Sequence, residues 1–158
     1  MKINEAFLGL KHDDLSIKLC QLIEQDFPGQ NERVFNSERC EFDCNFLGFL
    51  DQYYHLSQII PEEYIVLDLG CYASSQGYFF RNHKQYIGVD LYDGQRYKFE
   101  NTLNKIQDIG EAIEEYASNQ TNIFVICNYT SHIMGNENNV NIRKTFGNIF
   151  NFYPTIRP

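Results

Sequence analysis

The chain has 158 residues, a formal net charge of −8 at pH 7, 43% hydrophobic residues and 15% aromatic residues. This length fits one domain with a single core, and the apolar content excludes a largely disordered protein. The negative charge repels phosphate backbones at long range, which argues against direct binding of DNA or RNA.

The cysteines and the apolar segments predict a cytoplasmic protein. No sustained apolar region follows Met1, and no uninterrupted apolar stretch approaches membrane-spanning length. Five scattered cysteines, an odd number, suit free thiols in a reducing compartment. Cys40, Cys44 and His55 make only a partial zinc site because a fourth ligand at suitable spacing is missing, so we predict no metal.

The sequence pattern of the N-terminal third predicts two helices. Apolar residues recur at helical spacing over residues 14–27, with Asp13 or Asp14 as the N-cap and Pro28-Gly29 as the stop. Residues 30–41 are polar and are predicted to form a loop. The helical pattern returns over residues 44–60 and ends at Pro61. We therefore expect residues 1–61 to form a helical cover that packs against a sheet.

Residues 62–158 alternate between strand and helix patterns. Strands are predicted at 65–69, 86–89, 122–127 and 149–153, with a possible edge strand at 97–100, and helices at 75–83, 102–118 and 140–146. Such alternation implies a parallel sheet with right-handed crossovers. The predicted fold is a single α/β domain over residues 1–158. It is a Rossmann-like three-layer sandwich with a mostly parallel sheet of about five strands and two leading N-terminal helices.

The first two strands carry the strongest indication of a binding site. The apolar run 65–69 leads into Gly70, and the second run ends in Asp90, 22 positions after Asp68. An acid at the end of the second strand of a βαβ unit is placed to bind a ribose. Ligands bind such sheets at the carboxyl ends of the strands, so Asp68, Gly70, Asp90 and Asn128 are expected to converge there.

The segment from Asp68 to Asp90 resembles the class I S-adenosylmethionine (SAM)-dependent methyltransferases. Their first motif reads roughly Asp-x-Gly-x-Gly-x-Gly, and their second ends strand two with Asp or Glu. Asp68, Gly70 and Asp90 match, whereas Tyr72 and Ser74 stand where the second and third glycines would be. An RNA methyltransferase variant, Asp-Leu-Gly-x-x-Pro-Gly-Gly, aligns no worse. The resemblance covers about residues 65–153.

The resemblance implies a SAM-dependent methyltransferase acting on a small molecule or a protein. The cofactor-binding residues would be Asp68, Gly70, Cys71, Tyr72, Asp90 and Leu91. Asp90 would accept hydrogen bonds from both ribose hydroxyls, and Leu91 or Tyr92 would cover the adenine. The catalytic candidates are Asn128 and Tyr129, which match part of an Asn-Pro-Pro-Tyr motif without its prolines. Further candidates are Glu100 or Asn101 for the third motif, near the adenine amine, and His83 or His132 as general bases.

Several alternatives remain open. A nicotinamide dehydrogenase needs Gly-x-Gly-x-x-Gly, of which only Gly70 is present, and Tyr72 would crowd a pyrophosphate. The fold could also be an empty Rossmann-like core or a nucleoside-binding regulator. Another alternative is a non-catalytic acidic interaction or inhibitor protein, for example a phage or mobile-element anti-defence protein. A sheet that ends early leaves an unpaired edge, which favours a homodimer or a protein partner.

Overall fold

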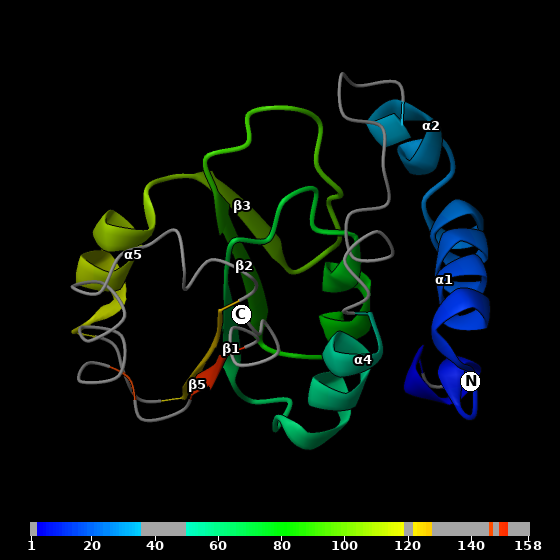
Figure 1. The fold of residues 1–158 in the computed structure, drawn as a ribbon, viewed down its shortest axis with the longest axis horizontal. Helices are drawn as coiled ribbons and strands as arrows, with labels where there is room; N and C mark the ends of the chain where they lie inside the picture. Colours follow the sequence, from blue (N-terminus) through cyan, green and yellow to red (C-terminus); the bar gives the residue numbers. More distant parts are fainter. Residues whose placement is uncertain (1–2, 36–49, 119–121, 128–145, 147–148, 152–158) are drawn as a thin grey trace, which may run out of the picture.

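Figure 1 shows the computed structural model, which describes residues 3–35, 50–118, 122–127, 146 and 149–151. Its sheet has the order β3-β2-β1-β4-β5, and every pairing is parallel. The strands are β1 (Ile65–Leu69), β2 (Gln85–Asp90), β3 (Thr102–Ile106), β4 (Ile123–Cys127) and the three-residue β5 (Ile149–Asn151). The protein is therefore α/β with an all-parallel sheet, an arrangement consistent with a Rossmann-like fold.

Helices lie on both faces of the sheet. They are the 3-10 helix η1 (Ile3–Phe7), α1 (His12–Asp26), α2 (Gln30–Phe35), α4 (Leu50–Ile59), the 3-10 helix η2 (Ser75–Phe80) and α5 (Ile109–Tyr116). In Figure 1, α4 lies on one side of the sheet with α1 outside it, and α5 lies on the other side. The described elements thus form three layers.

Two buried clusters explain why the central strands are apolar without alternation. Val66, Tyr86 and Ile126 belong to the cluster shared with α1, α4 and η2. Leu67 and its neighbours on β2 and β4 belong to the second cluster, which includes residues of α5. A strand that is covered on both faces must be apolar at successive positions, as is usual in parallel sheets.

The N-terminal region contains more helix than the sequence indicated. Helix α1 confirms the prediction for residues 14–27, but its N-cap is Lys11, not Asp13 or Asp14. Residues 30–35, predicted as loop, form α2, so η1, α1, α2 and α4 all precede the sheet instead of two helices. The short α2 is held by tertiary contacts, because Val34 is buried and Asn31 Nδ2 donates to the Cys20 carbonyl oxygen at 2.9 Å.

Two predictions around β3 were wrong. Residues 97–100 contain no strand, and residues 102–106, predicted as the start of a helix, form β3 on the edge of the sheet. The helical spacing of Leu103, Ile106 and Ile113 was misleading because it joins two different elements. Helix α5 begins only after Asp108, whose carboxylate accepts hydrogen bonds from the amides of Gly110 and Glu111. Tertiary pairing with β2 overrides the local helical pattern.

Three further predictions concerned free cysteines, membrane-spanning helices and the helices at residues 44–60 and 140–146. Cys20, Cys71 and Cys127 are free thiols. Among the described helices, none is both long and apolar enough to cross a bilayer. The predicted helix 140–146 lies outside the described residues apart from Phe146, as do positions 44–49 of the predicted second helix.

Candidate functional site

The turn after β1 has an unusual backbone. Gly70, Tyr72 and Ser74 all have positive φ, at 84°, 54° and 67°. These are the three positions at which the sequence resemblance expects glycine. A left-handed conformation costs a residue with a side chain about 1–2 kcal/mol. The turn therefore keeps a glycine-type backbone although tyrosine and serine occupy two of its positions.

Hydrogen bonds to β2 and to the segment after it hold this turn in place. The amides of Gly70 and Cys71 both donate to the Val89 carbonyl oxygen, at 2.8 and 3.2 Å. The Tyr97 amide donates to the Ala73 carbonyl oxygen at 2.8 Å. The strained residues are thus fixed from two sides, as is required for strain to persist in a folded protein.

The Asp90 carboxylate lies against the turn, as the convergence argument predicted. Its Oδ2 accepts a hydrogen bond from the Tyr72 amide at 2.8 Å, and its Oδ1 accepts one from the Tyr92 amide at 2.9 Å. A carboxylate has about four acceptor sites, so each oxygen keeps capacity for one further donor. Asp90 is half-buried at the carboxyl end of β2. It can therefore both anchor the turn and accept hydrogen bonds from a ligand.

The side chains of Tyr72 and Tyr92 stack beside this carboxylate. Their ring centroids are 4.6 Å apart and their planes differ by 12°. Gly94 lies beneath the Tyr92 ring, and a Cβ there would come within 2.0 Å of the Tyr92 hydroxyl oxygen. The stacked pair forms an aromatic surface at the turn.

Asp68 has a different environment from Asp90, because it is fully buried. Its carboxylate accepts hydrogen bonds from the Tyr53 hydroxyl at 2.9 Å, the Gln76 side-chain amide (Nε2) at 2.9 Å and the Tyr86 hydroxyl at 2.5 Å. These donors come from α4, η2 and β2. The Asp68 side chain thus joins three elements to β1 beneath the turn.

Burial raises the pKa of Asp68 to about 6, although its three hydrogen bonds oppose this shift. Because this value lies above the ordinary 3.8, the folded state favours the protonated acid. The resulting stabilisation is complete below the unfolded-state pKa and is lost as pH rises through the folded-state pKa.

We therefore expect a pH-dependent difference in the free energy of unfolding between the native protein and Asp68→Asn. On going from about pH 7.5 to about pH 5, the native protein should gain about 1 kcal/mol relative to the variant. Urea unfolding of both proteins at the two pH values measures this. An unchanged difference would mean that Asp68 does not titrate in this range.

Cys71 contributes to the packing below the turn. Its thiol is fully buried, and burial raises the pKa of the Cys71 thiol well above its ordinary value. A Cβ on Gly88 would come within 2.9 Å of the Cys71 sulfur and within 2.9 Å of the Ser74 hydroxyl oxygen. Glycine at position 88 thus allows the turn to approach β2. Since the thiol faces this contact, a ligand above the turn would meet the Cys71 backbone and not its sulfur.

Two large apolar side chains are exposed at the carboxyl ends of neighbouring strands. Leu91 directly follows β2 and is 67% exposed, and Ile106 ends β3 and is 65% exposed. β2 and β3 pair with Asp90 opposite Ile106. The candidate carboxylate is therefore flanked by apolar surface on both strands.

The residues proposed for the third motif lie at the other end of β3. Glu100 forms an ion pair with Arg81, and Asn101 Nδ2 donates to the carbonyl oxygens of Phe80 and His83. The acid that follows the carboxyl end of β3 is Asp108. Its spacing to Glu111 matches a capping box, a signal that would have located this helix start from the sequence.

The remaining candidates are either remote or outside the described residues. His83 is buried before the amino end of β2, and its Nε2 lies 2.9 Å from the Ile60 carbonyl oxygen. Burial lowers the pKa of His83. Asn128, Tyr129 and His132 lie outside the described residues. Within the described part of the chain, no group of three or more His, Cys, Asp or Glu side chains could hold a metal ion.

Comparisons with protein-family models, with curated proteins and with solved structures found no match for this chain.

Proposed function

We propose that the protein binds a nucleoside, with SAM as the first candidate, at the carboxyl ends of β1 and β2. The observation that carries this proposal is the contact between the Asp90 carboxylate and the turn that begins at Gly70. The Tyr72 amide donates a hydrogen bond to the Asp90 carboxylate at 2.8 Å. The two carboxylate oxygens at the edge of the turn could therefore accept hydrogen bonds from the ribose hydroxyls.

The surroundings of Asp90 suit the other parts of such a ligand. Leu91 and Ile106 offer exposed apolar side chains on adjacent strands, which suit the faces of an adenine ring. The turn from Gly70 to Ser74 contributes backbone to the amino-acid part of SAM. Asp108, which follows the carboxyl end of β3, replaces Glu100 and Asn101 as the proposed third-motif residue.

Methyl transfer is the activity that the resemblance implies for a SAM-binding protein with this motif order. SAM would supply an electrophilic methyl group, and the protein would bind and orient it. Asn128 and Tyr129 stay the proposed residues for orienting a nucleophile on a small-molecule or protein acceptor. A nucleoside-binding regulator would share the binding site and lack turnover, so a methylation assay separates the two.

Substitution of Leu91 tests the binding proposal without removing a core residue. We expect Leu91→Asp to weaken SAM binding about tenfold or more, because it places a charge where the adenine face would lie. Isothermal titration calorimetry with SAM and with its demethylated product measures this. Ile17→Asp is the matched control, since Ile17 is 57% exposed on α1, the helix that lies outside α4 in Figure 1. No heat with either ligand for the native protein would contradict the proposal.

The stacked tyrosines favour a second candidate, a non-catalytic acidic interaction or inhibitor protein on a methyltransferase-like scaffold. Tyr72 and Tyr92 form an aromatic surface next to the position proposed for the ligand, and the chain carries a net charge of −8. If these rings fill the nucleoside position, the native protein will not bind SAM, whereas Tyr72→Gly will. The φ of 54° at Tyr72 suits glycine, so the fold should tolerate this variant.

A further inference from the structure

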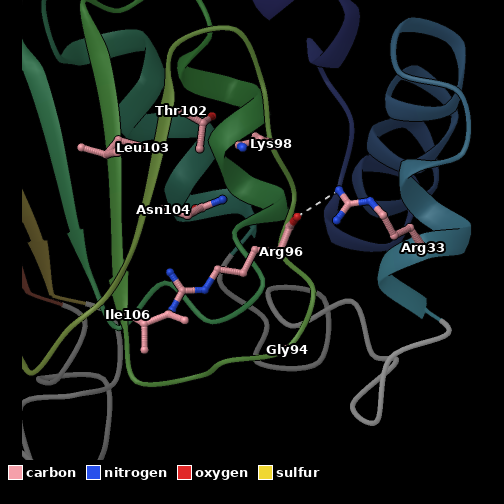
Figure 2. Close-up of a pocket in the computed structure, with 8 residues that line it drawn as sticks. All are labelled: Arg33, Gly94, Arg96, Lys98, Thr102, Leu103, Asn104 and Ile106. Carbon is pink, nitrogen blue, oxygen red and sulfur yellow. Dashed lines mark hydrogen bonds between the residues drawn. The ribbon is translucent and has the colours of Figure 1, made fainter.

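A cavity of about 340 Å³ lies between α2, the segment 94–98 and the outer strand β3. Figure 2 shows the residues that line it: Arg33, Gly94, Arg96, Lys98, Thr102, Leu103, Asn104 and Ile106. Three of them are cationic and none is acidic, although the chain as a whole carries a net charge of −8. The lining of this cavity is thus positively charged.

The three cations have no carboxylate partner within the described residues, where the ion pairs involve Arg81 and Lys105 instead. Arg33 donates to neutral oxygens, namely the Gln95 side chain at 2.6 Å, the Gln30 side chain at 2.9 Å and the Arg96 carbonyl at 3.1 Å. These bonds hold Arg33 against the segment 94–98 without an ion pair to a carboxylate of the described residues.

Arg96 supplies a fixed charge from the wall of the cavity. It is only 7% exposed, and its guanidinium donates to four backbone carbonyls. These belong to Gly88 (3.4 Å), Asp90 (2.7 Å), Tyr92 (2.7 Å) and Lys105 (3.0 Å). These neutral carbonyls accept hydrogen bonds from its two terminal nitrogens without forming an ion pair, and its Nε is buried with no hydrogen-bond partner. A buried cation without an ion pair among the described residues makes the adjacent cavity attractive to anions.

Donors for an anion remain on the other walls. Arg33 has five N–H groups and uses three of them in the bonds above. The Thr102 hydroxyl oxygen accepts a hydrogen bond from the Phe99 amide at 3.2 Å, so its own hydrogen can still donate. Lys98 is exposed, and it lines the cavity beside Thr102 in Figure 2. The cavity therefore offers several donors and a net positive charge.

We infer that this cavity binds a small oxyanion with a charge of −2 or more, such as an organic phosphate or a polycarboxylate. Guanidinium and ammonium groups are the side chains that recognise these anions. The volume is near the lower end of small-molecule sites, which suits a compact ligand better than a polymer. Ile106, which is 65% exposed, provides apolar contact for the organic part. Ile106 borders both this cavity and the proposed nucleoside site, but the inference uses neither the Asp90 carboxylate nor the turn at Gly70.

Calorimetric titration with pyrophosphate and, separately, with citrate tests the inference at low salt and distinguishes phosphate from carboxylate ligands. We expect at least one probe to bind, and Lys98→Met to weaken its binding about tenfold through loss of a charged donor. Arg33→Met is a second variant with the same expectation. Lys84→Met is the matched control, because Lys84 is exposed at the amino end of β2 and should leave binding unchanged. Absence of binding by both probes at millimolar concentration, or equal weakening in Lys98→Met and Lys84→Met, would overturn the inference.

Discussion

Asp68→Ala is expected to lower the free energy of unfolding by about 3–5 kcal/mol at neutral pH. The substitution removes the acceptor of three buried hydrogen bonds, from Tyr53, Gln76 and Tyr86. Those donors would stay buried without the carboxylate, and a cavity would form between β1, α4 and η2. Such a loss is a large part of the stability of an ordinary domain, so the variant should unfold at much lower urea concentration.

Two control variants separate this effect from a general effect of removing an acid. Glu63→Ala removes an exposed carboxylate just before β1 and should change stability by less than about 0.5 kcal/mol. Asp68→Asn keeps the side-chain shape and one acceptor oxygen, so it should lower the free energy of unfolding less than Asp68→Ala does. If Asp68→Ala and Glu63→Ala unfolded at the same urea concentration, the carboxylate would not be the structural link described here.

Arg96→Met should produce the second largest loss, about 2–4 kcal/mol. Its guanidinium connects the carboxyl end of β2 to the Tyr92 and Lys105 carbonyls, and all four of its hydrogen bonds come from one charged group. Methionine preserves most of the buried aliphatic volume and removes every one of these bonds. The measurement is urea unfolding monitored by circular dichroism.

Arg96→Lys is the informative comparison for this variant. Lysine keeps the positive charge but lacks the planar fork that reaches several carbonyls at once. We expect it to recover only part of the lost stability. Full recovery would mean that charge alone matters at this position, and an unchanged stability of Arg96→Met would show that the four hydrogen bonds are not needed for the fold.

The central strands were predictable because each is a short apolar run with a turn signal on both sides. β1, β2 and β4 are buried on both faces, so apart from Asp68 and the polar ends of β2 their residues are apolar or glycine, and these runs can be identified without tertiary information. The acid at the end of β2 was likewise recognisable from its place after such a run. The central strands and the acid at the end of β2 could be predicted because burial requires apolar residues and because the order of the elements is given by the sequence.

The elements around β3 could not be assigned in the same way. β3 is an edge strand with both polar and apolar residues, and it is stabilised by pairing with β2 and by Arg96, which lies outside its own sequence. Helix α2 has only six residues and depends on contacts with α1 and with the segment 95–98. Both β3 and α2 depend on tertiary contacts, and the local pattern of apolar and polar residues does not predict such contacts.

The candidate site was predicted in part. Asp90 and the turn at Gly70 meet as expected, because the carboxyl ends of adjacent parallel strands lie at one edge of the sheet. The sequence did not predict that the Asp68 carboxylate and the Cys71 thiol are fully buried, because a motif gives the order of residues and not the direction of their side chains. The stacking of Tyr72 on Tyr92 was missed for the same reason.

The amide resonances of Tyr72 and Tyr92 provide the most direct test of the proposed nucleoside site. Both amides donate to the Asp90 carboxylate, so a ribose that bonds to this carboxylate must change their environment. On titration with SAM, we expect the two-dimensional ¹⁵N–¹H spectrum to show shifts of these two resonances together with that of Leu91. Unchanged Tyr72 and Tyr92 resonances at millimolar SAM would contradict nucleoside binding at this position.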